Sequence, residues 1–198
     1  NVYLLGEAYK PGQYTVSGLS SVTNALFVSG GVNQYGSLRN IQVKRNNKII
    51  GTYDFYDFIL KGNAKSDIRL LDGDVIFIPF IEKRVRMGGA FKRPATYEFK
   101  SGETVADAIK LAGGFTYLVP PKPSIEVSYI EKKDFTRKLE TLEDVSMYSR
   151  PLTNEDSINV SSISGISSEI IKISGEVKRP GDYFIQKGET ILDVIKRA

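Results

Sequence analysis

The stretch Gly175-Glu176-Val177-Lys178-Arg179-Pro180-Gly181-Asp182-Tyr183 decides the fold, because the 198-residue chain contains it three times in related form. The other two copies are Gly89-Ala90-Phe91-Lys92-Arg93-Pro94-Ala95-Thr96-Tyr97 and Gly6-Glu7-Ala8-Tyr9-Lys10-Pro11-Gly12-Gln13-Tyr14. Their first glycines lie 83 residues (6 to 89) and 86 residues (89 to 175) apart. Such self-similarity at a nearly fixed period indicates a repeat architecture. The chain is therefore two copies of one unit followed by the start of a third.

A β-hairpin is predicted at the start of each copy. An apolar strand (residues 2–6, 85–89 and 170–175) leads into a turn in which proline fixes φ and a small residue follows. A second strand then alternates, so that its aromatic and aliphatic side chains share one face: Tyr14 with Val16, Tyr97 with Phe99, and Tyr183 with Ile185. We expect these tyrosines to bridge the core and its rim, in preference to stacking on a sugar.

A helix follows each hairpin. Thr104 with Asp107 three residues later approximates a capping box, and Thr190 with Asp193 repeats it. An apolar stripe lies behind the first of these caps, at helical spacing: Val105, Ala108, Ile109 and Ala112. A Gly-Gly pair (30–31 and 113–114) ends the first two helices, and in the first copy the helix starts at Ser20 or Ser21.

The remainder of each copy reads mostly as strands. In the first copy we expect strands at 41–45 and 49–51, a short helix at 54–60, a turn at Leu71-Asp72-Gly73-Asp74 and a strand at 75–79. The second copy follows the same order more loosely: we expect a strand at 125–130, the counterpart of the turn at 152–156, and a strand at 158–160. This order predicts an α+β fold, with each copy a small mixed sheet packed on one main helix.

Three further motifs complete the signature: Gly102-Glu103-Thr104-Val105, Ala112-Gly113-Gly114, and Leu70-Leu71-Asp72-Gly73-Asp74-Val75-Ile76. With the Pro-Gly-x-Tyr hairpin, they resemble the soluble-ligand-binding β-grasp (SLBB) family over essentially the whole chain. The resemblance implies tandem ubiquitin-like β-grasp modules at residues 1–83 and 84–168. Residues 169–198 would be the hairpin and helix of a truncated third module.

Tandem SLBB modules are similar to those of bacterial outer-membrane polysaccharide and capsule export proteins. That resemblance implies a non-enzymatic, periplasmic part of an export protein, associated with the outer membrane of a Gram-negative bacterium. Its implied partners are the polysaccharide, an anionic one included, other copies of the full-length protein, and an inner-membrane export protein. Nucleic acid is not among them. We expect membrane contact only through segments outside this chain, because no apolar run approaches the roughly 18 residues that cross a bilayer.

Composition argues against an enzyme or a metalloprotein. The chain has neither cysteine nor histidine, which excludes thiolate chemistry and removes the usual ligands of zinc and the usual proton-transfer group. No pair of carboxylates is singled out by its spacing. We therefore predict no catalytic residue, no metal site and no cofactor.

Basic residues beside the repeated proline are the candidate ligand-binding residues. They are Lys10, Lys92, Arg93, Lys178 and Arg179. If the modules stack in similar orientations, these side chains would recur along one face and attract an anionic polymer. The alternative is a solvated turn that merely tolerates lysine and arginine.

Two questions stay open at the level of sequence. A ligand-binding module that captures a small soluble sugar or cofactor is the alternative function, and a closed pocket would favour it. We also expect both ends of the chain to be boundaries within a longer protein. The third hairpin and helix would then lean on the second module or borrow strands from a neighbouring chain.

Overall fold

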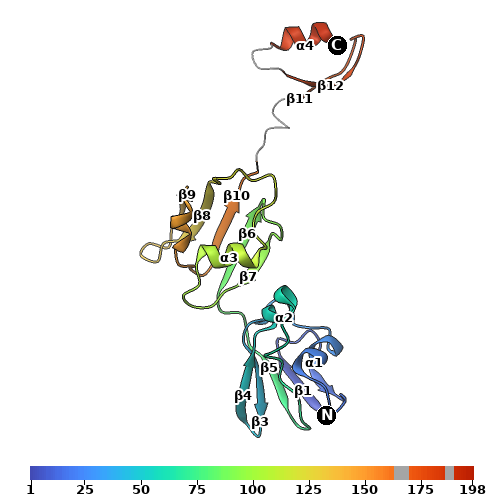
Figure 1. The fold of residues 1–198 in the computed structure, drawn as a ribbon, viewed down its shortest axis with the longest axis vertical. Helices are drawn as coiled ribbons and strands as arrows, with labels where there is room; N and C mark the ends of the chain where they lie inside the picture. The colour runs from blue at the N-terminus through green and yellow to red at the C-terminus, as the bar shows by residue number, and fades with distance from the viewer. Residues whose placement is uncertain (163–169, 186–189) are drawn as a thin grey trace.

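The computed structural model describes residues 1–162, 170–185 and 190–198. Figure 1 shows two sheet-and-helix modules in succession, followed by a hairpin and a helix of a third unit. The first module consists of β1 (Val2–Gly6), β2 (Gly12–Tyr14), α1 (Val22–Val28), β3 (Ile41–Arg45), β4 (Lys48–Tyr53), α2 (Phe55–Lys61) and β5 (Val75–Ile78). The second consists of β6 (Arg84–Gly89), β7 (Ala95–Glu98), α3 (Val105–Leu111), β8 (Ile125–Ile130), β9 (Arg137–Leu142), the 3-10 helix η1 (Val145–Ser149) and β10 (Asp156–Val160).

Both modules contain the same five-stranded mixed sheet. The strand order is β2-β1-β5-β3-β4 in the first module and β7-β6-β10-β8-β9 in the second. In each, the first and last strands run parallel at the centre (β1 with β5, β6 with β10), while the other neighbours are antiparallel. Repeating this topology around one main helix confirms the α+β fold of tandem β-grasp-like modules.

Alternating side chains build one apolar core in each module. In β1, Val2 and Leu4 point inward and are fully buried, and in β6 the matching Val85 and Met87 do the same. The helix stripe supplies the other side of each core. Burial of such side chains contributes roughly 1.5–3 kcal/mol each, which makes these two faces the main source of stability.

The predicted helix caps are present. Thr104 and Asp107 form a reciprocal capping box at α3, and Ser21 with Asn24 does so at α1. The Gly-Gly pairs follow the helices with positive φ, the conformation in which glycine avoids a steric penalty. The second glycine of each pair also anchors the hairpin turn. The carbonyls of Gly31 and Gly114 accept hydrogen bonds from backbone N–H groups in the turn before the proline.

The repeated tyrosine holds the repeated turn. The Tyr14 hydroxyl donates to the carbonyl of Lys10 at 2.6 Å, and the Tyr97 hydroxyl donates to that of Arg93 at 2.7 Å. The Tyr183 hydroxyl makes the same contact with Arg179. Each tyrosine therefore bonds the residue four positions before it, which explains why the spacing between the turn and the tyrosine is constant.

Two elements of the second module escaped the sequence analysis. β9 (Arg137–Leu142) and η1 (Val145–Ser149) were not predicted, whereas the turn expected at 152–156 is present at Asn154 and Glu155, directly before β10. β9 is an edge strand of mostly polar, exposed residues, so its sequence lacks the apolar alternation of a buried strand. The tertiary pairing with β8 makes it a strand.

The third unit repeats the hairpin and the helix. β11 (Ile170–Ile173) pairs with β12 (Gly181–Phe184) as a two-stranded sheet, and α4 (Ile191–Arg197) starts with a capping box of Thr190 and Asp193. Among the described residues, no strand of the second module joins this sheet. The expectation that the unit leans on the second module thus gains no support from strand pairing. Within the same described ranges, no helix is long and apolar enough to cross a membrane.

Candidate functional site at the joint between the first two modules

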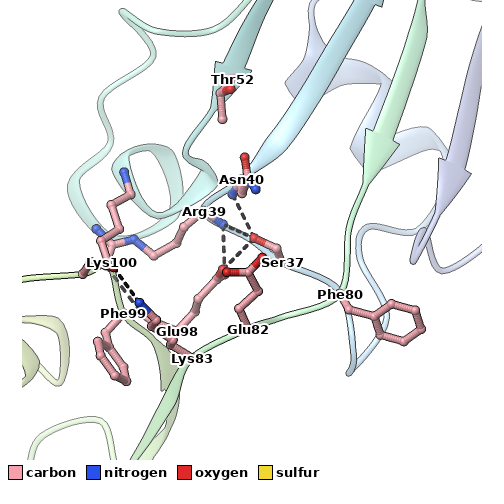
Figure 2. A pocket seen from close by; sticks show the side chains of 11 residues that line it. Ser37, Arg39, Asn40, Thr52, Phe80, Glu82, Lys83, Glu98, Phe99 and Lys100 are labelled. Carbon is pink, nitrogen blue, oxygen red and sulfur yellow. Dashed lines mark hydrogen bonds between the residues drawn. The ribbon is translucent and has the colours of Figure 1, made fainter. Parts of the chain in front are cut away.

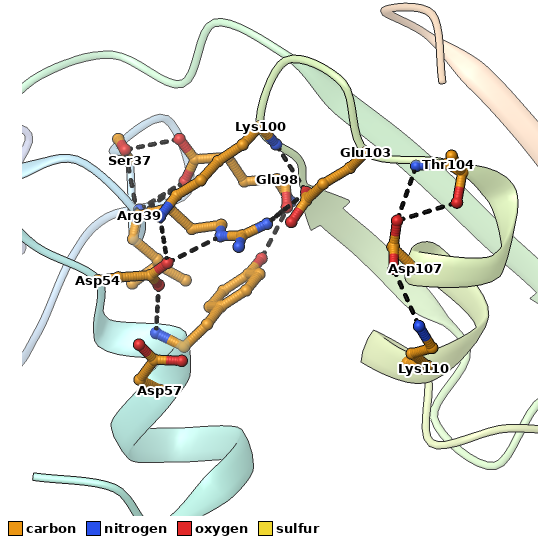
Figure 3. A network of polar contacts seen from close by, with 12 residues as sticks. Ser37, Arg39, Asp54, Asp57, Glu98, Lys100, Glu103, Thr104, Asp107 and Lys110 are labelled. Carbon is orange, nitrogen blue, oxygen red and sulfur yellow. Dashed lines mark hydrogen bonds and ion pairs between the residues drawn. The ribbon is translucent and has the colours of Figure 1, made fainter. Parts of the chain in front are cut away.

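The first two modules are fastened by a network of polar contacts, shown in Figure 3. The first module contributes the loop of residues 37–40 before β3 and the beginning of α2. The second contributes the end of β7 and the loop that leads into α3. We refer to this network as the joint; its members are Ser37, Leu38, Arg39, Asp54, Tyr56, Glu98, Lys100 and Glu103.

Glu98 is the centre of the joint. Its carboxylate accepts hydrogen bonds from the Ser37 hydroxyl at 2.6 Å and from the backbone N–H groups of Leu38 and Arg39 at 2.8 and 3.0 Å. The side chain is only 7% exposed. A buried carboxylate is costly unless its oxygens are satisfied, and here three donors of the neighbouring module satisfy them. The two modules therefore complete each other's hydrogen bonding at this point.

Arg39 spans the joint in the opposite direction. Its Nη1 donates to Glu103 Oε2 at 2.7 Å in the second module, while its Nε donates to Asp54 Oδ2 at 3.2 Å in the first. Lys100 of the second module adds a further ion pair across the joint, because its Nζ lies 2.7 Å from the same oxygen of Asp54. Charges from both modules thus alternate in sign across the boundary, which fixes their relative orientation as well as their contact.

Tyr56 adds an apolar component to the joint. It belongs to the first module by sequence, yet its ring packs within the core cluster of the second. Its hydroxyl accepts a hydrogen bond from the Glu98 N–H at 3.0 Å, and its ring meets Tyr97 edge-on at 6.3 Å. The guanidinium of Arg39 covers the other side, 5.3 Å from the ring centre. Leu38 packs against both cores.

The surroundings of Arg39 and Tyr56 in the joint favour a charged guanidinium and a neutral hydroxyl. Burial alone would lower the pKa of Arg39, but its hydrogen bonds and ion pairs with Glu103 and Asp54 raise it above the ordinary value. Burial raises the pKa of Tyr56 to about 12, so its hydroxyl stays neutral over the physiological range. Arg39 and Tyr56 therefore keep these protonation states near neutral pH.

A pocket of about 300 Å3 opens beside the network, and Figure 2 shows its lining. Lys83, Lys100 and Glu82 border it together with the aromatic rings of Phe80 and Phe99. The pocket is open to solvent. Among the described residues, no group of three or more Asp, Glu, His and Cys is arranged to hold a metal ion.

The five predicted ligand-binding residues all lie on exposed turns. The side chains of Lys10, Lys92 and Lys178 make no hydrogen bond or ion pair with other described residues, and the three lie in separate units at the repeated hairpin. Arg93 has a structural task, because its Nη2 donates to the carbonyl of Leu111 at 3.1 Å and so caps the end of α3. The N–H of Arg93 donates to the carbonyl of Ala112. The N–H of Arg179 makes the equivalent hydrogen bond with the carbonyl of Ala198.

The expected turn at Asp72–Asp74 is a structural element. Asp74 is fully buried, and its carboxylate accepts two hydrogen bonds from Arg45 at 2.8 Å each and one from the Leu71 N–H at 2.8 Å. The second module repeats this clamp with Asp156 and Arg150, 2.7 Å apart. Asp74 thus stabilises the entry to the last strand of the module.

Sequence reasoning missed the joint. Its central residue, Glu98, stands between Tyr97 and Phe99 on the side of β7 that alternation assigns to solvent. The repeat gives no help, because Thr15 and Phe184 occupy the corresponding positions in the other copies. The available signal was weak: Asp54 was recognisable as an N-cap for α2, and it also binds Arg39.

Comparison with known proteins agrees with this architecture. Residues 84–120 and 170–198 match the family model of the SLBB domain. Together these segments make up a third of the chain. They coincide with the hairpin and helix of the second module and of the third unit, so the resemblance derived from the repeated motif is confirmed.

Curated relatives extend the similarity to the whole chain. Two, both polysialic acid transport protein KpsD of Escherichia coli, are each 26% identical to it over 199 residues. The alignment covers 99% of this chain and 34% of the relative, so the chain spans about a third of the length of the curated relatives it matches.

Proposed function

We propose that this chain is a non-enzymatic structural segment of a polysaccharide export protein, in which SLBB modules set in fixed relative orientation contribute to the wall of an export conduit. The joint is the observation that supports this proposal. A chain whose modules only capture separate ligands has no need for a buried carboxylate shared between them. A conduit does need modules that keep one orientation while a polymer passes.

The similarity to the Escherichia coli transport protein supports the same reading. Transport of a surface polysaccharide implies a place in the periplasm, in contact with the outer membrane through other parts of the protein. It further implies assembly of several copies and cooperation with an inner-membrane export partner.

An in-frame deletion of residues 1–162 in the full-length protein tests the proposal in cells that make the surface polysaccharide. We expect polymer to accumulate inside the cell and to disappear from its surface. The substitution Glu98→Ala, compared with the unsubstituted protein at matched protein level, should reproduce part of that loss. Unchanged surface polysaccharide in the deletion strain would refute the proposal.

The basic residues at the repeated turns form a second part of the proposal. Lys10, Lys92, Lys178 and Arg179 would attract an anionic polymer, because each is exposed and every unit has at least one of them beside the repeated proline. Arg93 would contribute less, since its guanidinium already caps α3. The double substitution of Lys92→Gln and Lys178→Gln should slow export of an acidic polymer. The control is Lys65→Gln, which changes an exposed lysine outside the repeated hairpins.

Capture of a small sugar or cofactor remains the alternative function. The pocket beside the joint has a volume at the lower end of the range for small-ligand sites, which favours capture, but it is open to solvent and not closed. Calorimetry of the chain with monosaccharides and short neutral oligosaccharides decides between the two. Saturable binding that Lys100→Ala abolishes would favour capture, whereas heats no larger than those of dilution would leave the structural role.

A further inference from the structure

The outer face of the second sheet, turned away from α3, carries an unusual row of polar side chains. We call it the arginine face and define it as Arg84, Arg86, Thr96, Ser128, Arg137 and Ser157. Strand register places Arg86 of β6 between Thr96 of β7 and Ser157 of β10, and Ser157 beside Ser128 of β8. Neighbouring strands lie about 4.8 Å apart, so this row is continuous across four strands.

Two arginines of this face have no ion-pair partner among the described residues. The side chain of Arg86 is exposed and makes no hydrogen bond with that part of the chain, whereas the Arg137 side chain donates only to the Ser128 hydroxyl, from Nη1 at 3.0 Å. Arg84 differs, because its Nε is paired with Glu155 at 2.7 Å. The face therefore offers two guanidinium groups whose charge is not neutralised by the protein.

These side chains line a hollow in the surface. A pocket of about 370 Å3 is bordered by Arg84, Arg86, Thr96, Arg137, Glu155, Asp156 and Ser157. The Asp156 carboxylate does not counter the arginines, since it is buried and bound by Arg150 at 2.7 Å and by the Thr153 N–H at 2.9 Å. The volume lies within the range of about 300–1,000 Å3 that is typical of small-ligand sites.

The fold itself does not require arginines on this face. In the first module the corresponding face carries no arginine in this row: Tyr3 takes the position of Arg86 and Val75 that of Ser157, with Gln13 and Lys44 on the flanking strands. Its single basic group, Lys44, is occupied, because Nζ lies 4.4 Å from the centre of the Phe77 ring. The two modules share one topology and differ in the chemistry of this surface, which points to a function of the second module alone.

We infer that the arginine face binds carboxylate groups of an acidic saccharide chain. Guanidinium groups match planar carboxylates through paired hydrogen bonds, and they keep their charge at any physiological pH. Thr96, Ser128 and Ser157 add hydroxyl groups suited to the polar edges of a sugar. The choice of a saccharide rests on the proposed export function; the preference for a carboxylate rests on the arginines.

Calorimetry of the full chain with acidic tetrasaccharides tests the inference. The probes are a sialic acid tetramer and a tetramer containing glucuronic acid, each compared with its carboxyl-reduced, neutral form. We expect at least one acidic tetramer to bind, its neutral form to bind at least tenfold more weakly, and the affinity to fall as salt increases. Arg86→Gln and Arg137→Gln should each reduce the affinity about tenfold, the effect of losing one hydrogen bond to a charged group.

Lys44→Gln is the matched control, because it removes a basic group from the same face of the first module. It should leave the affinity unchanged. Binding of neither acidic tetramer, equal binding of the neutral forms, or equal losses in Arg86→Gln and Lys44→Gln would each overturn the inference. So would displacement of the tetramer by inorganic phosphate at equal concentration, because it would indicate a general anion site. The export assay of the deletion strain is independent, so a failure here leaves the proposed function standing.

Discussion

The second module and the third unit begin with the same signature but bury it differently. Glu98 at the end of β7 is covered by the first module, whereas Phe184, its counterpart at the end of β12, is 60% exposed. The helices show the same contrast: Val105 is fully buried in α3, and the matching Ile191 is 68% exposed in α4. Local rules thus form the hairpin and the helix in both places, while burial depends on the rest of the sheet and on the preceding module.

The contrast separates two sources of order. Capping boxes and the tyrosine-to-turn hydrogen bond are local, and both regions have them. The joint is not local, because Glu98 meets residues about 60 positions earlier in the chain. Position 184 holds no carboxylate, so the third unit cannot be fastened by the same contacts. The following predictions challenge this distinction, from the largest effect to the smallest.

Glu98→Ala should have the largest effect. The substitution leaves the Ser37 hydroxyl and the N–H groups of Leu38 and Arg39 without their acceptor inside the joint. Removing one partner of a buried charged network costs about 3–5 kcal/mol. Urea denaturation of the full chain measures the loss in the free energy of unfolding. Phe184→Ala, at the corresponding position of the third unit, should change that value by less than about 0.5 kcal/mol; equal losses would remove the distinction between the two regions.

Arg39→Met should have the next largest effect. Methionine preserves much of the apolar stem but removes the hydrogen bonds to Glu103 and Asp54, with an expected cost of about 2 kcal/mol. Arg84→Met is the control, because the ion pair of Arg84 with Glu155 is roughly half exposed on both sides and should contribute less than about 1 kcal/mol. A cost for Arg39→Met no greater than that for Arg84→Met would show that the joint does not depend on its charges.

Tyr56→Phe should cost about 1 kcal/mol, the net value of the hydrogen bond that its hydroxyl accepts from the Glu98 N–H. The control lies in the same core: the Tyr148 hydroxyl is buried without a hydrogen-bond partner in the described structure. Tyr148→Phe should therefore leave stability unchanged or slightly increased. If both substitutions cost the same, the hydroxyl of Tyr56 has no specific role.

The same tyrosine predicts a response to alkaline pH. Burial raises its pKa in the folded protein to about 12, above the unfolded value near 10. A group whose pKa is raised by folding contributes stability that is complete below its unfolded pKa. That contribution is lost as pH rises through the folded value. Between pH 10 and 12 the native chain should therefore lose stability more steeply than Tyr56→Phe; parallel pH profiles in denaturation midpoints would contradict this.

Much of the fold was predictable because the motif of the hairpin and helix occurs three times in the sequence. The constant distance from Pro94 to Tyr97, the capping box at Thr104 and the Gly-Gly pair each have a local physical cause, and each recurs in another copy. β9 was missed because an exposed edge strand has no apolar alternation. The joint was missed because alternation describes one module at a time, and it assigns Glu98 to solvent that the first module in fact displaces.

Substitutions at the two helix caps should give the smallest effect and the sharpest contrast. Thr104→Ala removes the cap of α3, whose residues pack into the five-stranded module, and should lower the free energy of unfolding by about 1 kcal/mol or less. Thr190→Ala removes the equivalent cap of α4, but a two-stranded hairpin with one helix is marginal by itself. We therefore expect the denaturation midpoint of the chain to stay unchanged in Thr190→Ala, while amide hydrogen exchange in α4 becomes faster. A lower midpoint in Thr190→Ala would mean that the third unit unfolds together with the first two modules, and that a contact other than strand pairing couples them.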